Sequence, residues 1–349
     1  MNRDEFISLL TRILETHSPS GQEEEMDALA LEEMKKTNAE ISTDDGGNVF
    51  GFMKGTGAKP PVIVTAHKDE IGVIVKRIED DGRLALDNIG GSYPWRYGEG
   101  PMDVLADTGI VTGFLSFGAS HISEETENVH EAKTRKPLTW KMVRLDMKLS
   151  KEELREKGIR PGSRAVVSRS RKTPTIIGDY FGAYALDDKA LIAIMIEAMK
   201  ELSGTGEQPP RDIYFVVTSG EEIGVSGAAY AAQHFPADEL IALEVAPVAK
   251  EYRIENTPQP VLIYKDGRSV YHKETTDVLY RLAEQLGFGC QSAIVTSYGS
   301  DASYTHRYGT IGRPVNLSIP TENTHGYEIS NLTVMENTVA LLAAYLKRE

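Results

Sequence analysis

The sequence has almost no cysteine and no long apolar segment. Cys290 is the single cysteine among 349 residues, so an intramolecular disulfide is excluded and a reducing compartment is the expected environment. We interpret Cys290 as a small packed side chain. The N-terminal residues never form an uninterrupted apolar run, so neither a secretory signal nor a membrane span is predicted, and we expect a cytoplasmic protein.

Positive charge is also scarce. The chain has 38 lysine and arginine residues against 52 aspartate and glutamate residues, which gives a formal net charge of −14 at pH 7. This charge repels phosphate backbones, and no basic stripe with interleaved aromatic residues offsets it, so nucleic-acid binding is not expected. The composition is that of a folded globular protein, and the length predicts one large domain with a smaller second one.

Strand and helix signals alternate near both ends of the chain. Apolar spacing predicts a helix from Phe6 to Leu14. Ser20 and Glu23 have the form of a capping box for a second helix, which we expect to run to about Lys36. The apolar run from Val62 to Ala66 predicts a buried central strand.

The middle of the chain has a different pattern. Between residues 73 and 175, short strand signals separated by turn residues predict a β-rich insert with one helix, Lys151 to Lys157. The alternation then resumes, with helices predicted at 188–202, from 226, at 275–286 and at 332–346, and strands at 213–218, 241–245, 290–295 and 315–319. We therefore predict an α/β domain formed by residues 1–72 and 176–349, interrupted by the insert. The stretches 203–210 and 168–172 have the composition of linkers.

Residues able to bind metal or transfer protons cluster around the predicted apolar strands. Open α/β sheets place their ligand sites at the carboxyl ends of strands, so these side chains are candidates for one site. One histidine and one carboxylate per metal, with a shared bridging carboxylate, would suit two zinc-like ions, although spacing alone does not select that set. The candidates are His67, Asp69, Asp187, Asp188, Glu221, Glu222, Glu244 and His325.

Each candidate also has an ordinary interpretation. His67 and Asp69 would point to the same side of a strand, which lets the carboxylate orient the imidazole, but a polar strand end has the same pattern. Glu221-Glu222 could be plain surface, Asp188 could be a helix N-cap, and a lone loop histidine such as His325 is commonly structural. The remaining histidines have no converging ligand set: His17, His121, His130, His234, His272 and His306.

Taken together, the motifs resemble the cocatalytic metallopeptidase family that includes glutamyl aminopeptidase, deblocking aminopeptidase and the tetrahedral aminopeptidases. The likeness runs nearly end to end, and the motifs are specific only in combination. They are Ser20-Gly21-Gln22-Glu23, Gly47-Asn48-Val49, Ala66-His67-Lys68-Asp69-Glu70-Ile71-Gly72, Asn88-Ile89-Gly90-Gly91, Gly158-Ile159-Arg160-Pro161-Gly162, Ala185-Leu186-Asp187-Asp188-Lys189, Gly220-Glu221-Glu222-Ile223-Gly224, Ser300-Asp301-Ala302, and Ile319-Pro320-Thr321 with His325.

The resemblance implies a fold, a set of cofactors and an assembly. The fold is a zinc-exopeptidase-like α/β/α sandwich with a mixed sheet, and the insert is a barrel-like domain that drives dimer formation. Dimers are implied to build a twelve-subunit tetrahedral shell that acts on peptides. Each subunit is implied to hold two divalent metal ions, zinc first, with cobalt or manganese as alternatives. In the implied ligand set, His67 and Glu244 bind one metal, Glu222 and His325 bind the other, and Asp187 bridges both.

Two further residues have implied roles. Asp69 orients His67, and Glu221 is the general base, which takes a proton from the attacking water and returns it to the leaving amine. Two other functions stay open: a related two-metal amide hydrolase that acts on N-acyl amino acids, and a family member without catalytic activity.

The chain also departs from the usual family pattern at three places. Lys68 replaces an apolar residue, Ser219-Gly220 stand where a glutamine is common, and Glu244 replaces an aspartate. The extra methylene of Glu244 moves a ligand oxygen by about one bond length, which bears on metal choice and affinity.

Overall fold

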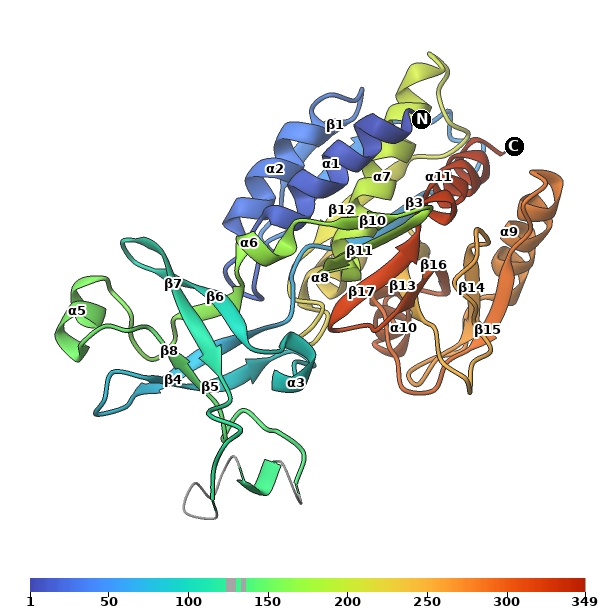
Figure 1. The fold of residues 1–349 in the computed structure, drawn as a ribbon. Coiled ribbons are helices and arrows are strands. Elements are labelled where there is room, and N and C mark those ends of the chain that lie inside the picture. The colour runs from blue at the N-terminus through green and yellow to red at the C-terminus, as the bar shows by residue number, and fades with distance from the viewer. Residues whose placement is uncertain (124–129, 133–135, 349) are drawn as a thin grey trace.

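The computed structural model describes residues 1–123, 130–132 and 136–348. Figure 1 shows an α/β body with a smaller β body beside it. The helices in these residues are α1 (Arg3–Glu15), α2 (Glu24–Met34), α3 (Pro94–Tyr97), α5 (Lys151–Glu156), α6 (Arg169–Lys172), α7 (Leu186–Gly204), α8 (Ser226–His234), α9 (Lys273–Gln285), α10 (Asp301–Arg307) and α11 (Leu332–Lys347). None of these described helices is both long enough and apolar enough to cross a membrane.

The α/β body is built on one mixed sheet. Its strands are β1 (Glu40–Thr43), β2 (Val49–Met53), β3 (Val62–His67), β10 (Thr175–Ile177), β11 (Tyr180–Tyr184), β12 (Ile213–Thr218), β13 (Glu239–Pro247), β14 (Val261–Lys265), β15 (Gln291–Ile294), β16 (Arg313–Glu322) and β17 (Tyr327–Asn331). Their order is β1-β2-β12-β3-β13-β16-β17-β11-β10, with β14 pairing β16 and β15 pairing β14. Strands β12, β3, β13 and β16 run parallel at the centre.

Helices cover both faces of this sheet. Along β3, Val64 and Ala66 pack into the core that includes α1, α2, α7 and α11, whereas Ile63 packs into a second core with α8 and α10. Successive side chains of a strand point to opposite faces, so a strand buried on both sides reads as a continuous apolar run. The predicted α/β/α sandwich is therefore confirmed.

The smaller body is a closed barrel. Its strands are β4 (Gly72–Ile78), β5 (Leu84–Ile89), β6 (Gly100–Ala106), β7 (Gly109–Ser116), β8 (Arg144–Asp146) and β9 (Arg164–Val167), in the order β4-β5-β8-β7-β6-β9. Alternate residues such as Val73 and Val75 fill its core together with Trp140. The barrel strands all fall within the predicted insert or at its first boundary.

The predicted capping box at Ser20 and Glu23 is wrong. Helix α2 begins one residue after Glu23, and Ser20 Oγ instead donates a 2.6 Å hydrogen bond to Asp69. Glu23 is buried and lies 3.4 Å from the ammonium of Lys68, which also pairs with Asp27. The buried ammonium of Lys68 is thus neutralised by acidic residues at the start of α2.

The predicted linker at 168–172 is also wrong, because it forms α6 and buries Lys172 completely. The Lys172 ammonium lies 2.6 Å from Glu70 Oε1, and Lys189 lies 3.2 Å from the same oxygen. His17 lies between Lys172 and Asp103, with its two ring nitrogens 3.1 Å and 3.0 Å from them. These buried charges connect the segment after α1 with α6, α7 and the barrel strand β6 at the junction of the two bodies.

Candidate metal centre

The candidate residues meet at the carboxyl edge of the parallel strands. His67 is the last residue of β3, and Glu244 lies in β13 beside it. The Glu221-Glu222 pair follows β12, and His325 follows β16. Asp187 lies at the start of α7, which packs against β3 and β13. The edge predicted from the sequence is therefore where these side chains are found.

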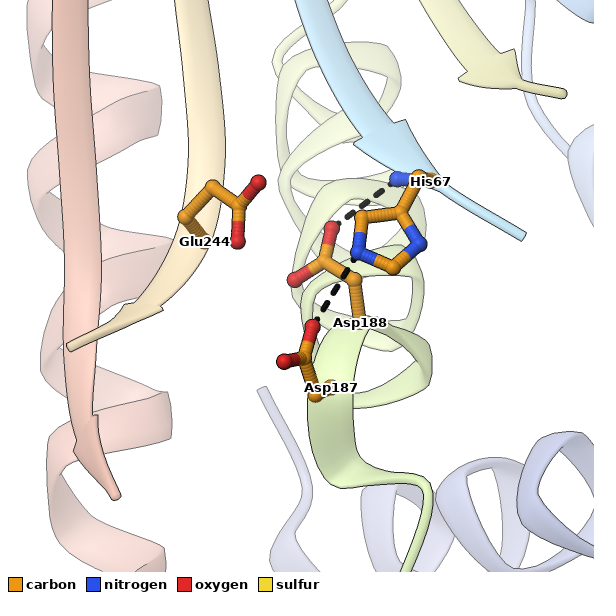
Figure 2. A group of neighbouring side chains, drawn as sticks. All are labelled: His67, Asp187, Asp188 and Glu244. Atoms are coloured by element: carbon orange, nitrogen blue, oxygen red, sulfur yellow. Dashed lines mark hydrogen bonds and ion pairs between the residues drawn. The ribbon is translucent and has the colours of Figure 1, made fainter. Parts of the chain in front are cut away.

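The side chains form two groups that could each hold a metal ion. In the first, ligand atoms of His67, Asp187, Asp188 and Glu244 all lie within 4.8 Å of one another, and Figure 2 shows Glu244 facing the other three across the group. In the second, the same limit holds for Asp187, Glu222 and His325. Asp187 belongs to both groups.

The two oxygens of Asp187 face different histidines. Its Oδ1 lies 3.1 Å from His67 Nε2, and its Oδ2 lies 3.5 Å from His325 Nε2. His325 Nε2 is also 3.6 Å from Glu222 Oε1. Burial raises the pKa of Glu222 to about 7, with Asp187 and Asp69 adding to the rise and His325 opposing it. Carboxylates gathered around two imidazole nitrogens are the ligand types that bind divalent cations in proteins.

Asp188, a candidate from the sequence, is part of the first group, although the family resemblance implies no ligand role for it. The alternative that Asp188 caps the helix is wrong, because its carboxylate accepts no hydrogen bond from the first turn of α7 and its Oδ2 instead accepts the main-chain N–H of His67 at 2.9 Å. Its Oδ1 is buried and has no hydrogen-bond partner among the described residues. Burying a carboxylate oxygen that has no hydrogen-bond partner, close to other acids, costs free energy. A bound cation would offset that cost, so these ligand atoms fit a metal site.

Asp69 holds the turn that carries the glutamate pair. Its Oδ1 accepts the backbone N–H of Glu221 at 2.9 Å, and its Oδ2 accepts that of Glu222 at 3.1 Å. His67 Nδ1 lies 3.0 Å from the Asp69 main-chain oxygen but 3.5 Å from its carboxylate. Burial raises the pKa of Asp69, yet hydrogen bonds from His67, Ser20 and Glu221 outweigh it and leave that pKa below its ordinary value. Asp69 therefore stays ionised as an acceptor.

Glu221 lines a cavity of about 600 Å³ that opens beside both groups. The other residues of its wall include His67, Asp187, Glu222, Glu244 and His325, together with Tyr252, Tyr298, Tyr304 and Arg268. Burial raises the pKa of Glu221 well above its ordinary value, and the acids Asp301, Glu222 and Asp69 add to the rise while His67 opposes it. A carboxylate with a raised pKa beside a substrate-sized cavity is suited to accept a proton.

The barrel contributes directly to the second group. The loop between β5 and α3 brings the carbonyl oxygen of Gly91 to 3.1 Å from His325 Nδ1. A Cβ at Gly91 would lie 2.6 Å from that nitrogen, and one at Gly90 would lie 3.0 Å from Glu222 Oε2. The Gly90-Gly91 motif is therefore explained by close approach of the barrel backbone to two candidate ligands.

The histidines that were set aside do not join either group within the described residues. His17 is buried in the ionic cluster at the junction of the two bodies, as described above. His272 caps α9, where its ring accepts a hydrogen bond from the backbone of Thr275. Both have structural roles.

Comparison with known proteins agrees with the geometry. Residues 47–341 match the M42 glutamyl aminopeptidase family. A protein of Acetivibrio thermocellus, named provisionally as an aminopeptidase, is 30% identical over 98% of this chain and 98% of its own. An aminopeptidase from Desulfurococcus kamchatkensis has a TM-score of 0.89 at 26% identity, covering 99% of this chain and 95% of that chain. The TET1 peptidase of Pyrococcus horikoshii has a TM-score of 0.86 at 25% identity, covering 99% and 100%. The chain belongs to the M42 glutamyl aminopeptidase family and is a metal-dependent aminopeptidase.

Proposed function

We propose that the two groups hold a pair of divalent cations and that the enzyme removes N-terminal residues from unblocked peptides. The observation that carries this proposal is the place of Asp187 in both groups, with its two oxygens directed at different histidines. We assign His67 and Glu244 to one ion, Glu222 and His325 to the other, and Asp187 to both.

The donor set supports zinc as the resident ion, with cobalt or manganese as alternatives. Imidazole nitrogens with carboxylate oxygens are ligands that zinc accepts, and several other first-row divalent ions use the same donors. Glu244 stands where the family usually has aspartate, yet its carboxylate lies within 4.8 Å of the His67 and Asp187 ligand atoms. The longer side chain therefore still reaches the group.

In the proposed mechanism, Glu221 moves the proton. When bound, the two cations would lower the pKa of the attacking water and polarise the scissile carbonyl. Glu221 lines the cavity beside both groups and takes the proton from the water as that water attacks. It then returns the proton to the departing amine. Asp69 keeps Glu221 in place through the backbone hydrogen bond described above.

The charge of the cavity supports cleavage at an N-terminus. The base and the cations occupy Glu221, Glu222 and Glu244, which leaves Glu251 as a carboxylate of the cavity wall that could pair with a cationic α-amine. A peptide bound through that amine would present its first peptide bond to the metal pair. An N-acylated substrate has no such amine, so this argument favours peptides over acylated amino acids.

We further propose that the enzyme is a cytoplasmic homo-oligomer. The TET1 peptidase of Pyrococcus horikoshii assembles into a tetrahedron or a large octahedral shell. By analogy, residues 73–175 would be the dimerisation domain beside a catalytic domain formed by residues 1–72 and 176–349, and dimers would build a dodecamer. Sedimentation of the purified protein tests this part, and a monomer at micromolar concentration would contradict it.

The activity is tested with a panel of unblocked aminoacyl-anilides. The protein is stripped of metal, and zinc, cobalt or manganese is restored in turn. We expect metal-dependent release of the anilide, and Glu221→Gln should reduce kcat by at least about 100-fold because it removes the base. Glu255→Gln, at an exposed carboxylate away from the cavity, is the matched control and should behave as wild type.

Two outcomes would contradict the proposal. Hydrolysis of N-acyl amino acids without hydrolysis of the anilides would indicate the related amide hydrolase. Binding of two metal ions without turnover of either substrate class would indicate a family member that has lost activity.

A further inference from the structure

Glu328 is a buried carboxylate that no step of the proposed mechanism uses. It lies in β17 and is 1% exposed. Its Oε1 accepts the main-chain N–H of His325 at 2.8 Å, and its Oε2 accepts the main-chain N–H of Asp187 at 3.0 Å. One carboxylate therefore holds the backbones of two residues that we assign to the metal pair.

Both of those backbones lack regular secondary structure. His325 has φ +61°, in the left-handed region that residues other than glycine rarely adopt. Asp187 lies at the irregular start of α7, with φ −75° and ψ 104°. Buried N–H groups outside a helix or ladder need a separate acceptor, and Glu328 supplies one to each.

Glu328 itself is held on a rigid element. Strand β17 pairs with β11 over five residues, and Glu328 is opposite Ala183 in that ladder. Strand β11 leads within three residues to Asp187, and His325 is only three residues before Glu328. The carboxylate is thus fixed at the point where the two ligand-bearing segments approach each other.

We propose that Glu328 is a positioning residue that sets the separation between Asp187 and His325, and with it the geometry of the second metal position. This inference rests on the proposed assignment of those two residues as ligands. Residues that do not touch the metal but hydrogen-bond to its ligands commonly change metal affinity by about 10–100-fold. Glu328 acts here through the backbone and has no assigned contact with substrate.

The test measures metal binding directly. Zinc or cobalt is titrated into the metal-stripped protein in competition with a chromogenic chelator, which resolves the two binding steps. In Glu328→Gln, the amide can accept from only one of the two N–H groups and presents an NH₂ to the other. We expect the combined affinity for the two ions to fall by about 10–100-fold. Both binding steps can contribute to the loss, because we assign Asp187 to both ions and His325 to one of them.

Two further variants make the result specific. Glu322→Gln is the matched control, since Glu322 accepts a hydrogen bond from Asn256 that a glutamine oxygen can also accept, and both binding steps should be unchanged. Glu328→Asp keeps the carboxylate with a shorter reach, so an intermediate loss is expected, and it serves as the test if the glutamine variant does not fold. Circular dichroism of the metal-stripped variants checks the fold.

The outcomes separate this inference from the proposed function. If folded Glu328→Gln binds both ions with wild-type affinity, Glu328 has no positioning role, although the metal pair stands. If the wild-type protein does not bind two ions, the ligand assignment fails and this inference fails with it. A fall in the combined affinity for the two ions in Glu328→Gln, partly restored in Glu328→Asp, supports the positioning role.

Discussion

Replacing Asp69 with asparagine should damage catalysis through the backbone of the glutamate pair. The carboxylate accepts hydrogen bonds from Ser20 Oγ at 2.6 Å, Glu221 N at 2.9 Å and Glu222 N at 3.1 Å. Asparagine has the same shape but only one acceptor oxygen, so one of the two N–H groups would face an NH₂. The turn that carries Glu221 and Glu222 would then keep only one of its two backbone hydrogen bonds to the side chain of residue 69.

The size of the effect follows from those contacts. A hydrogen bond to a charged group contributes about 1.5–3 kcal/mol, and an unsatisfied buried donor adds to the loss, so we expect unfolding free energy to fall by about 2–4 kcal/mol. Displacement of Glu221 and Glu222 should lower kcat/KM by about 10–100-fold. Thermal unfolding and steady-state kinetics on an aminoacyl-anilide measure the two effects.

A companion variant separates anchoring of the turn from general loss of packing. Ser20→Ala removes one hydrogen bond to the same carboxylate but leaves both backbone N–H groups satisfied, so kcat/KM should change by less than about fivefold. The reasoning is refuted if folded Asp69→Asn retains kcat/KM within about threefold of wild type, or if Ser20→Ala is equally impaired.

Three other perturbations have expected outcomes. Glu70→Gln leaves the buried ammonium groups of Lys172 and Lys189 without their shared counter-ion, so unfolding free energy at pH 7 should fall by about 3–5 kcal/mol in denaturant melts. Burial opposes ionisation of Glu70, but the two lysines hold its pKa at about 2 against 4.5 when unfolded. The difference in unfolding free energy between the wild type and Glu70→Gln should therefore be complete above pH 4.5 and disappear as pH falls toward 2. Gly91→Ala places a methyl 2.6 Å from His325 Nδ1, so the second metal should bind more weakly in a chelator titration, and unchanged affinity would contradict that contact. Chelation of metal should lower the thermal midpoint of the wild-type protein, because an ion bound only to the folded state stabilises it, and an unchanged midpoint would count against resident ions.

Much of the fold could be predicted because the apolar positions of the sequence correspond to the buried positions of the structure. The central strands and the long helices were found within a few residues of their true bounds, since runs such as 62–66 and 213–218 are buried on both faces. Strands β10, β11, β14 and β17 were missed, because each has only three to five residues and is too short for a periodic pattern to be recognised. Glu328 could not be identified without β17.

The ligand residues could be nominated from the sequence, but their partners could not. The placement of His67 and His325 after strands was a usable signal, and the family resemblance chose among the acids. The role of Asp188 as an acceptor for His67 depends on how α7 begins, and the burial of Lys172 depends on contacts with Glu70 across the chain. Such contacts between distant segments leave no periodic pattern for sequence reasoning to detect.

The close approach of Gly90-Gly91 to the second group has a consequence for protein engineering. The barrel is an insertion in the chain, yet its loop supplies the carbonyl that the His325 imidazole contacts. A minimal enzyme made by deleting the barrel, residues 72–167, would therefore lose part of the wall around a proposed ligand, even if the remaining α/β body folded. Shortening this protein while keeping its activity would require a replacement loop that returns a carbonyl oxygen to the same place.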